Sequence, residues 1–108
     1  MNTINANELQ AMMQQADNLV VLDVLPEESY EQEHIPGAHS LPVNDKNFTR
    51  RVEELAPHAG TPVAVYCADH ECGLSPKAAD TLEEHGYERV YDFAGGLDEW
   101  KKAGFDVA

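Results

Sequence analysis

The sequence predicts a single α/β domain with a mostly parallel sheet and helices on both of its faces. Strand-like and helix-like segments alternate from one end of the chain to the other, as they do in β-α-β units. Two segments, residues 19–24 and 62–67, are almost continuously apolar, which is typical of strands covered on both faces. A chain of 108 residues has room for one such core, so residues 1–108 are expected to form one domain.

Capping and turn residues predict where the helices begin and end. Asn5 and Glu8 have the spacing of a capping box, so the first helix is expected to follow Asn5. Pro26 fits the first position of a short acidic helix over residues 27–33. The remaining expected elements are short strands at residues 40–42 and 89–93 and helices at residues 47–55, 75–85 and 97–101, the first of these helices with Phe48, Val52 and Leu55 on its inner side.

The charge of the chain limits its partners. Seven Lys and Arg stand against twenty Asp and Glu, a formal net charge of -13, which repels phosphate backbones and anionic lipids. We therefore expect no nucleic-acid partner and no membrane-surface role. The acidic surface fits either solubility or a basic partner protein. No apolar run approaches the roughly 18 residues of a membrane span, and no basic segment precedes an apolar one at the N-terminus, so a cytoplasmic location is expected.

The only cysteines are Cys67 and Cys72, five positions apart. A disulfide framework needs more cysteines, and better spread ones, so this pair is expected to serve chemistry. A structural zinc site needs four ligands, and only His70 lies in the same stretch. No metal and no cofactor are therefore expected.

Cys67 is the candidate nucleophile because it ends a predicted buried strand. Ligands of open α/β sheets bind beyond the carboxyl ends of the strands. The chain then returns to a helix expected to begin at Ser75, whose free N–H groups and dipole would favour a thiolate. Alternatively, Cys67 is a small hydrophobic residue that closes the strand. The expected active-site loop consists of Cys67 with Ala68, Asp69, His70, Glu71, Cys72, Gly73, Leu74 and Ser75.

An ordered set of short motifs runs along the chain: Asp23-Val24, His34-Ile35-Pro36-Gly37-Ala38, Tyr66-Cys67, Ser75, Ala78-Ala79, Gly86-Tyr87, Val90-Tyr91, Gly95-Gly96-Leu97 and Trp100. In order and spacing this set resembles the rhodanese-like domain over nearly the whole chain. The resemblance implies a five-stranded parallel sheet flanked by helices. It also implies a cysteine that accepts a sulfane sulfur as a persulfide and passes it to cyanide or a thiol. Cys67 falls on that cysteine.

The chain departs from the family in its loop. Residues 67–74 make a loop about two residues longer than is usual in the family, without Arg or Lys but with Asp69 and Glu71. Leu25 stands where the family commonly has an arginine, and Glu33 where it has a glycine. Two nearby carboxylates oppose a dianion, so we expect thiosulfate to be bound poorly. Phosphatase or arsenate-reductase chemistry is disfavoured because the arginine that clamps an oxyanion is missing.

Cys72 is a candidate resolving thiol. It could attack a Cys67 persulfide or sulfenic acid, releasing sulfide or water and leaving a disulfide. This requires the loop to fold back until the two Cα atoms are about 4.4–6.8 Å apart. Alternatively, Cys72 is a buried filler thiol.

The sequence as a whole predicts a sulfurtransferase that takes sulfur from thiosulfate or a persulfide and gives it to a thiol or cyanide. The competing hypothesis is a non-catalytic module of the same fold that binds a partner protein. Within the expected site, His70 could supply the cation that the loop otherwise lacks, and His34 is expected to orient the turn that contains it.

Overall fold

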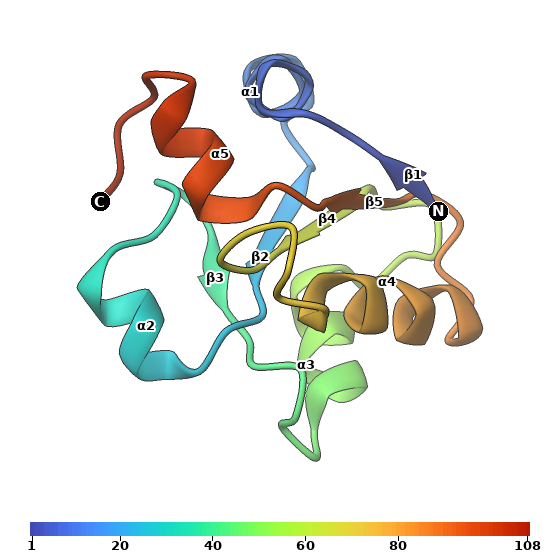
Figure 1. Ribbon diagram of the computed structural model, residues 1–108. Coiled ribbons are helices and arrows are strands. Elements are labelled where there is room, and N and C mark those ends of the chain that lie inside the picture. The colour runs from blue at the N-terminus through green and yellow to red at the C-terminus, as the bar shows by residue number, and fades with distance from the viewer.

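The computed structural model describes residues 1–108 and contains one sheet of five parallel strands in the order β1-β5-β4-β2-β3 (Figure 1). The predicted α/β class with a five-stranded parallel sheet is confirmed. The strands are β1 (Asn2–Thr3), β2 (Val20–Asp23), β3 (His39–Ser40), β4 (Val63–Tyr66) and β5 (Val90–Phe93). Because β4 lies in the centre, the loop that follows it opens in the middle of the carboxyl edge of the sheet.

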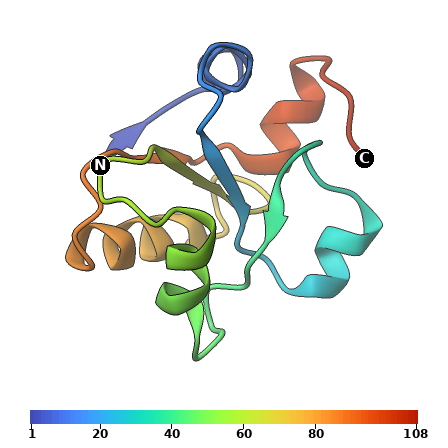
Figure 2. The same cartoon turned by 180° about the vertical axis from the view of Figure 1, so that it is seen from behind.

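Helices cover both faces of the sheet, as predicted. They are α1 (Ala6–Gln15), α2 (Glu27–Gln32), α3 (Phe48–Leu55), α4 (Leu74–Glu84) and α5 (Gly96–Lys102). Figures 1 and 2 show α1 and α5 on one face and α3 and α4 on the other, with α2 next to the edge strand β3. No helix combines the length and the apolar character that crossing a membrane requires.

Two hydrophobic cores lie on opposite faces of the sheet. Successive side chains of a strand point alternately into one core and the other. Val63, Val65 and Cys67 belong to the core beneath α3 and α4. Ala64 and Tyr66 belong to the core beneath α1 and α5. This double burial explains why β4 is apolar at every position, and β2 at every position except Asp23, rather than at every second one.

The capping box at the start of α1 is confirmed. The Asn5 side chain accepts a hydrogen bond from the Glu8 N–H over 2.8 Å, and the Glu8 carboxylate accepts one from the Asn5 N–H over 2.8 Å. The prediction for α4 is wrong by one residue. Gly73, in a left-handed conformation (φ 74°), caps a helix that begins at Leu74, and Ser75 lies buried inside its first turn. The loop after β4 is therefore residues 67–73.

Two further expectations differ from the structure. Leu55 is 38% exposed at the end of α3, although its spacing from Val52 predicted an inward position. β1 was not predicted from the local residue pattern, because Asn2 and Thr3 are polar and exposed. It is a strand through its parallel pairing with Tyr91 and Asp92 of β5.

Candidate active site

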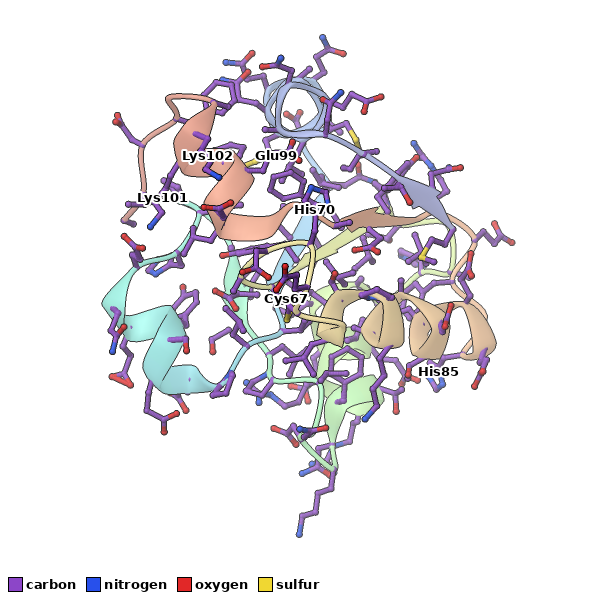
Figure 3. The ribbon with its side chains drawn as sticks, viewed as in Figure 1. Cys67, His70, His85, Glu99, Lys101 and Lys102 are labelled. Atoms are coloured by element: carbon purple, nitrogen blue, oxygen red, sulfur yellow. A yellow bond between two sulfur atoms is a disulfide. The ribbon has the colours of Figure 1, made fainter.

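Cys67 directly follows β4 and has no exposed surface. Its side chain lies on the α3 and α4 side of the sheet, in the same core as Val65. Figure 3 shows it beneath the loop, close to the beginning of α4. The Cys67 sulfur thus lies where the carboxyl end of a central strand meets a helix N-terminus, the arrangement expected from the sequence.

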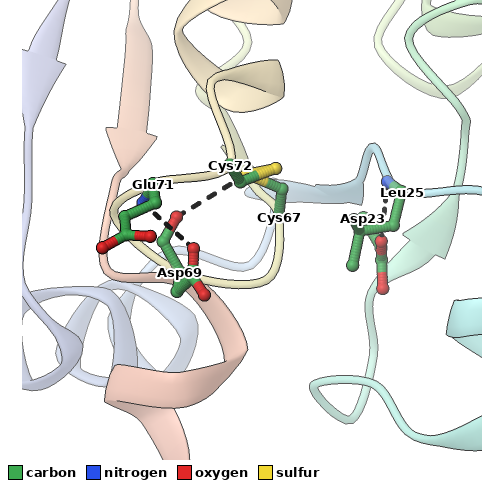
Figure 4. Close-up of a disulfide and its surroundings, with 6 residues drawn as sticks. All are labelled: Asp23, Leu25, Cys67, Asp69, Glu71 and Cys72. Atoms are coloured by element: carbon green, nitrogen blue, oxygen red, sulfur yellow. Dashed lines mark hydrogen bonds between the residues drawn. A yellow bond between two sulfur atoms is a disulfide. The ribbon is translucent and has the colours of Figure 1, made fainter.

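Cys67 and Cys72 are joined by a disulfide, with their Cα atoms 6.4 Å apart (Figure 4). The loop therefore folds back as the resolving-thiol hypothesis requires. Asp69 organises this fold: its carbonyl oxygen accepts a hydrogen bond from the Cys72 N–H over 3.3 Å, and its carboxylate accepts one from the Glu71 N–H over 3.0 Å. The redox role of Cys72 itself stays a prediction.

The start of α5 anchors the first half of the loop. The N–H groups of Leu97 and Asp98 donate to the carbonyl oxygens of Cys67 (3.0 Å) and Ala68 (2.9 Å). Gly96 makes this approach possible, because a Cβ atom there would overlap the Cys67 carbonyl group, and its φ of 59° also favours glycine. Gly96 is not among the site residues predicted from the sequence, although the Gly95-Gly96 pair is a signal that could have identified it.

His70 extends from the loop toward α5 rather than toward the sulfurs. Its Nε2 lies 3.7 Å from Oε1 of Glu99, and its side chain is 71% exposed (Figure 3). The other oxygen of Glu99 accepts a hydrogen bond from the Ala6 N–H over 2.6 Å. A charge on His70 would therefore be shared with a carboxylate.

The loop contains carboxylates and no guanidinium or ammonium group. Asp69 and Glu71 lie in the loop, and Asp98 and Glu99 follow in the helix that anchors it. Leu25, at the position where the resemblance leads one to expect arginine, packs with Cys72 and Leu74 against the core that contains Cys67. The surroundings of the two sulfurs are thus apolar with an acidic rim, which disfavours a dianion.

A hollow of about 370 Å³ lies beside the loop, at the same edge of the sheet. Its walls come from the segment between β2 and α2 with the first residue of α2, the segment after β3 and the first residue of α4. They are Val24, Pro26, Glu27, Pro42, Val43, Asn44, Asp45 and Leu74. Leu74 connects this hollow to the loop. Its lining could receive the apolar part of a sulfur donor or acceptor.

A buried polar network supports the strand ends behind Cys67. The Tyr66 hydroxyl donates to the Asp23 carboxylate over 3.0 Å and accepts from the Ile35 N–H over 3.0 Å. The second oxygen of Asp23 accepts from the Leu25 N–H over 3.0 Å. Burial raises the pKa of Asp23, and the hydrogen bonds from Leu25 and Tyr66 oppose that shift. The network ties β2 and β4 to the turn after α2, where His34 stacks on the ring of Tyr30.

Asp92 is a second buried carboxyl group, which sequence analysis missed. It lies on β5 opposite Val65, and it is 3% exposed, with one carboxyl oxygen that has no hydrogen-bond partner. Burial raises the pKa of Asp92, while a hydrogen bond from the buried Ser75 acts in the opposite direction. The signal in the sequence was an aspartate inside an otherwise apolar strand.

No group of three or more His, Cys, Asp or Glu side chains is arranged to hold a metal ion.

Comparison with known proteins shows which protein family the chain matches. The family model described as "Rhodanese-like domain" matches residues 5–103. A thiosulfate sulfurtransferase (GlpE) of Coxiella burnetii is 34% identical over 87 residues, which cover 78% of this chain and 73% of that protein. An HTH-type transcriptional regulator of Mycobacterium tuberculosis is 31% identical over 93 residues, which cover 86% of this chain but 39% of the regulator.

The fold comparison agrees with the sequence comparison. The crystal structure of a thiosulfate sulfurtransferase from Pseudomonas aeruginosa superposes with a TM-score of 0.87 at 29% identity. The match covers 99% of this chain and 20% of that one. This chain therefore spans less than half of two of these three relatives and about three quarters of the third.

Proposed function

This chain belongs to the rhodanese-like domain family, and on that premise we propose that it is a sulfurtransferase that carries sulfane sulfur as a persulfide on Cys67. The observation that carries the proposal is the position of Cys67, at the end of the central strand β4 and before the N-terminus of α4. Relatives named thiosulfate sulfurtransferases support the reaction class. They do not favour the competing hypothesis of a non-catalytic, partner-binding module.

The reaction begins with reduced Cys67, so the disulfide to Cys72 must first be opened. The Cys67 thiolate attacks the sulfane sulfur of the donor, an S–S bond forms, and the rest of the donor leaves with the electron pair, as sulfite when the donor is thiosulfate. An acceptor thiolate or cyanide then attacks the outer sulfur, and Cys67 leaves as the thiolate. Gly73 gives α4 no side-chain cap, so the N–H groups of its first turn stay free. These N–H groups and the helix dipole favour Cys67 both as the thiolate and as the persulfide anion.

The loop selects among donors by charge. A dianion such as thiosulfate meets Asp69 and Glu71 without a compensating cation in the loop. A neutral or singly charged persulfide or polysulfide carries less charge, and the apolar part of an organic one can enter the hollow beside Leu74. We therefore propose persulfides or polysulfides as the preferred donors. Phosphate or arsenate chemistry gains no support, because the loop offers no guanidinium to clamp a tetrahedral oxyanion.

Mass spectrometry of the intact protein tests this function. The Cys72→Ser variant, which has no second thiol, is reduced, desalted and incubated with thiosulfate or cysteine persulfide. We expect a mass gain of about 32 Da, one sulfur atom, located on Cys67 and removed by cyanide. Cys67→Ser is the matched control and should gain nothing. If neither donor adds sulfur to Cys67 in the folded Cys72→Ser variant, the proposed function is wrong.

A further inference from the structure

The geometry of the loop points to a second activity, which rests on the proposed function. We propose that Cys72 discharges the Cys67 persulfide internally, so that the sulfane sulfur leaves as sulfide and the chain is left with the Cys67–Cys72 disulfide. The chain would then be a dithiol-dependent reductase of sulfane sulfur as well as a sulfurtransferase. Its product would be sulfide rather than a new persulfide.

The disulfide itself shows that the required atoms meet. In a Cys67 persulfide the Sγ atom is the inner sulfur, and Sγ of Cys67 is the atom that Cys72 contacts in the structure. The bond is formed with a Cα separation of 6.4 Å, inside the usual range for disulfides. No other cysteine is present in the chain to compete for Cys67.

Both halves of the loop are held in this arrangement by backbone hydrogen bonds. On the Cys67 side, the N–H groups of Leu97 and Asp98 fix the carbonyl oxygens of Cys67 and Ala68. On the Cys72 side, Asp69 accepts hydrogen bonds from the N–H groups of Glu71 and Cys72. A thiol held beside its target reacts at an effective concentration far above that of a thiol free in solution. Attack of Cys72 on Sγ of Cys67 is therefore favoured over attack of an external acceptor on the outer sulfur of the persulfide.

The atoms and electrons balance in two steps. First, the Cys67 thiolate takes the sulfane sulfur of thiosulfate and sulfite leaves, which gives the Cys67 persulfide anion. Second, the Cys72 thiol attacks Sγ of Cys67; its proton goes to the departing sulfur, which leaves as hydrosulfide. The sulfane sulfur gains two electrons, and the two cysteine sulfurs lose them as the disulfide forms.

A dithiol reductant must then reopen the disulfide, and burial indicates where it attacks. Cys67 has no exposed surface in the disulfide form, whereas Cys72 is only partly buried. Access decides which sulfur of a disulfide is attacked. The reductant is therefore expected to bond first to Cys72 and to release Cys67 as the thiolate, ready for the next donor.

A single-turnover experiment tests this activity. Reduced, desalted protein is mixed with excess thiosulfate in the absence of oxygen, and sulfite, sulfide and intact mass are followed. Thiosulfate is chosen because its by-product, sulfite, contributes no thiol. Wild-type protein should release about one sulfide for each sulfite and end as the disulfide, about two mass units below the dithiol form. Cys72→Ser should release sulfite only and keep the added sulfur until dithiothreitol is supplied. Cys67→Ser should release neither product.

The outcomes separate this inference from the proposed function. If wild-type protein keeps the added sulfur as Cys72→Ser does, or if both release sulfide at equal rates without reductant, the internal discharge is wrong and the persulfide function stands. If Cys72→Ser takes up no sulfur from thiosulfate or cysteine persulfide, the proposed function is wrong. We expect sulfide release to be at least about 100-fold slower in Cys72→Ser than in wild type, given the effective concentrations of paired groups.

Discussion

Gly96 packs directly against the carbonyl group of Cys67, and the next residue, Leu97, donates its N–H to that carbonyl oxygen over 3.0 Å. A Cβ atom at position 96 would come within 2.9 Å of the Cys67 carbonyl carbon, closer than such atoms pack. The start of α5 thus acts as the support on which the reactive loop rests.

We therefore expect Gly96→Ala both to displace the loop and to lower the free energy of unfolding. A left-handed alanine costs about 1–2 kcal/mol, and the overlap with Cys67 adds about 1–3 kcal/mol. Gly104→Ala is the matched control, because Gly104 also has a positive φ of 89° but has open space around it. Urea unfolding should show a clearly larger loss of unfolding free energy for Gly96→Ala than for Gly104→Ala. Only Gly96→Ala should load sulfur more slowly. Equal effects of the two substitutions on stability and on loading would contradict this role.

Asp92 gives a prediction on pH and stability. Burial raises its pKa above the ordinary value of 3.8, so the folded protein binds this proton more tightly than the unfolded chain does. The contribution of Asp92 to the free energy of unfolding therefore increases as pH falls through the raised folded pKa, and it levels off below about 3.8. At pH 7.5 the buried carboxylate is a net cost.

Asp92→Asn removes that charge while keeping nearly the same shape. We expect the variant to be more stable than wild type at pH 7.5, with a difference that shrinks as the pH falls toward 4, at about 1.4 kcal/mol per unit of pKa shift. Thermal unfolding at a series of pH values measures it. Asp45→Asn, at a half-buried carboxylate whose pKa is lowered by hydrogen bonds from Asn47 and Arg51, should show the opposite sign. A pH-independent effect of Asp92→Asn would be evidence against the buried charge.

The elements that could be predicted from the sequence are those whose signal is local. Residues 19–24 and 62–67 predict β2 and β4 because both faces of these strands are buried. Asn5 and Glu8 predict α1 because a capping box spans only four residues. β1 carries no such signal, since only its pairing with β5 makes it a strand.

The residues of the candidate site likewise fall into those that a local sequence signal identifies and those that it does not. Cys67 and Cys72 could be identified because reactive residue types stood in one short segment. The roles of Gly96 and Asp92 depend on β5 and α5 approaching the loop across the sheet, which no local pattern encodes. The start of α4 was misplaced because Ser75 is a common capping residue, whereas the cap is Gly73 in a conformation that serine seldom adopts.

The acidic loop predicts a preference among sulfur donors. Wild-type protein should have a lower kcat/KM with thiosulfate than with cysteine persulfide. In the double variant Asp69→Asn/Glu71→Gln, kcat/KM for thiosulfate should rise about fivefold, which corresponds to roughly 1 kcal/mol for charges at close range in water. The amide side chain introduced by Asp69→Asn retains an oxygen that can accept the hydrogen bond from the backbone N–H of residue 71, so the loop should keep its fold.

The control for this variant is Asp17→Asn/Glu88→Gln. It changes the net charge equally, but at the amino ends of the strands, before β2 and β5. It should leave kcat/KM for thiosulfate almost unchanged. The difference between the two double variants should also shrink as salt is raised. A wild-type preference for thiosulfate at moderate salt would show that the loop carboxylates do not select the donor.

The last prediction concerns oxidation of the reduced protein. Peroxide converts the Cys67 thiolate to a sulfenic acid, and Cys72 lies close enough to attack its sulfur, forming the disulfide and releasing water. Because this step is internal, it should be faster than a second oxidation of Cys67 by dilute peroxide. The disulfide would then protect Cys67 from irreversible damage and leave it recoverable by a dithiol.

Peptide mapping after treatment with dilute peroxide measures this protection. Wild-type protein should yield a linked Cys67–Cys72 peptide and lose sulfur loading, and dithiothreitol should restore the loading. Cys72→Ser should instead accumulate sulfinic acid on Cys67 and lose loading permanently. If wild-type Cys67 is recovered as sulfinic acid while Cys72 remains a free thiol, then the two sulfurs do not act as a redox pair in the reduced protein, even though the folded loop can join them.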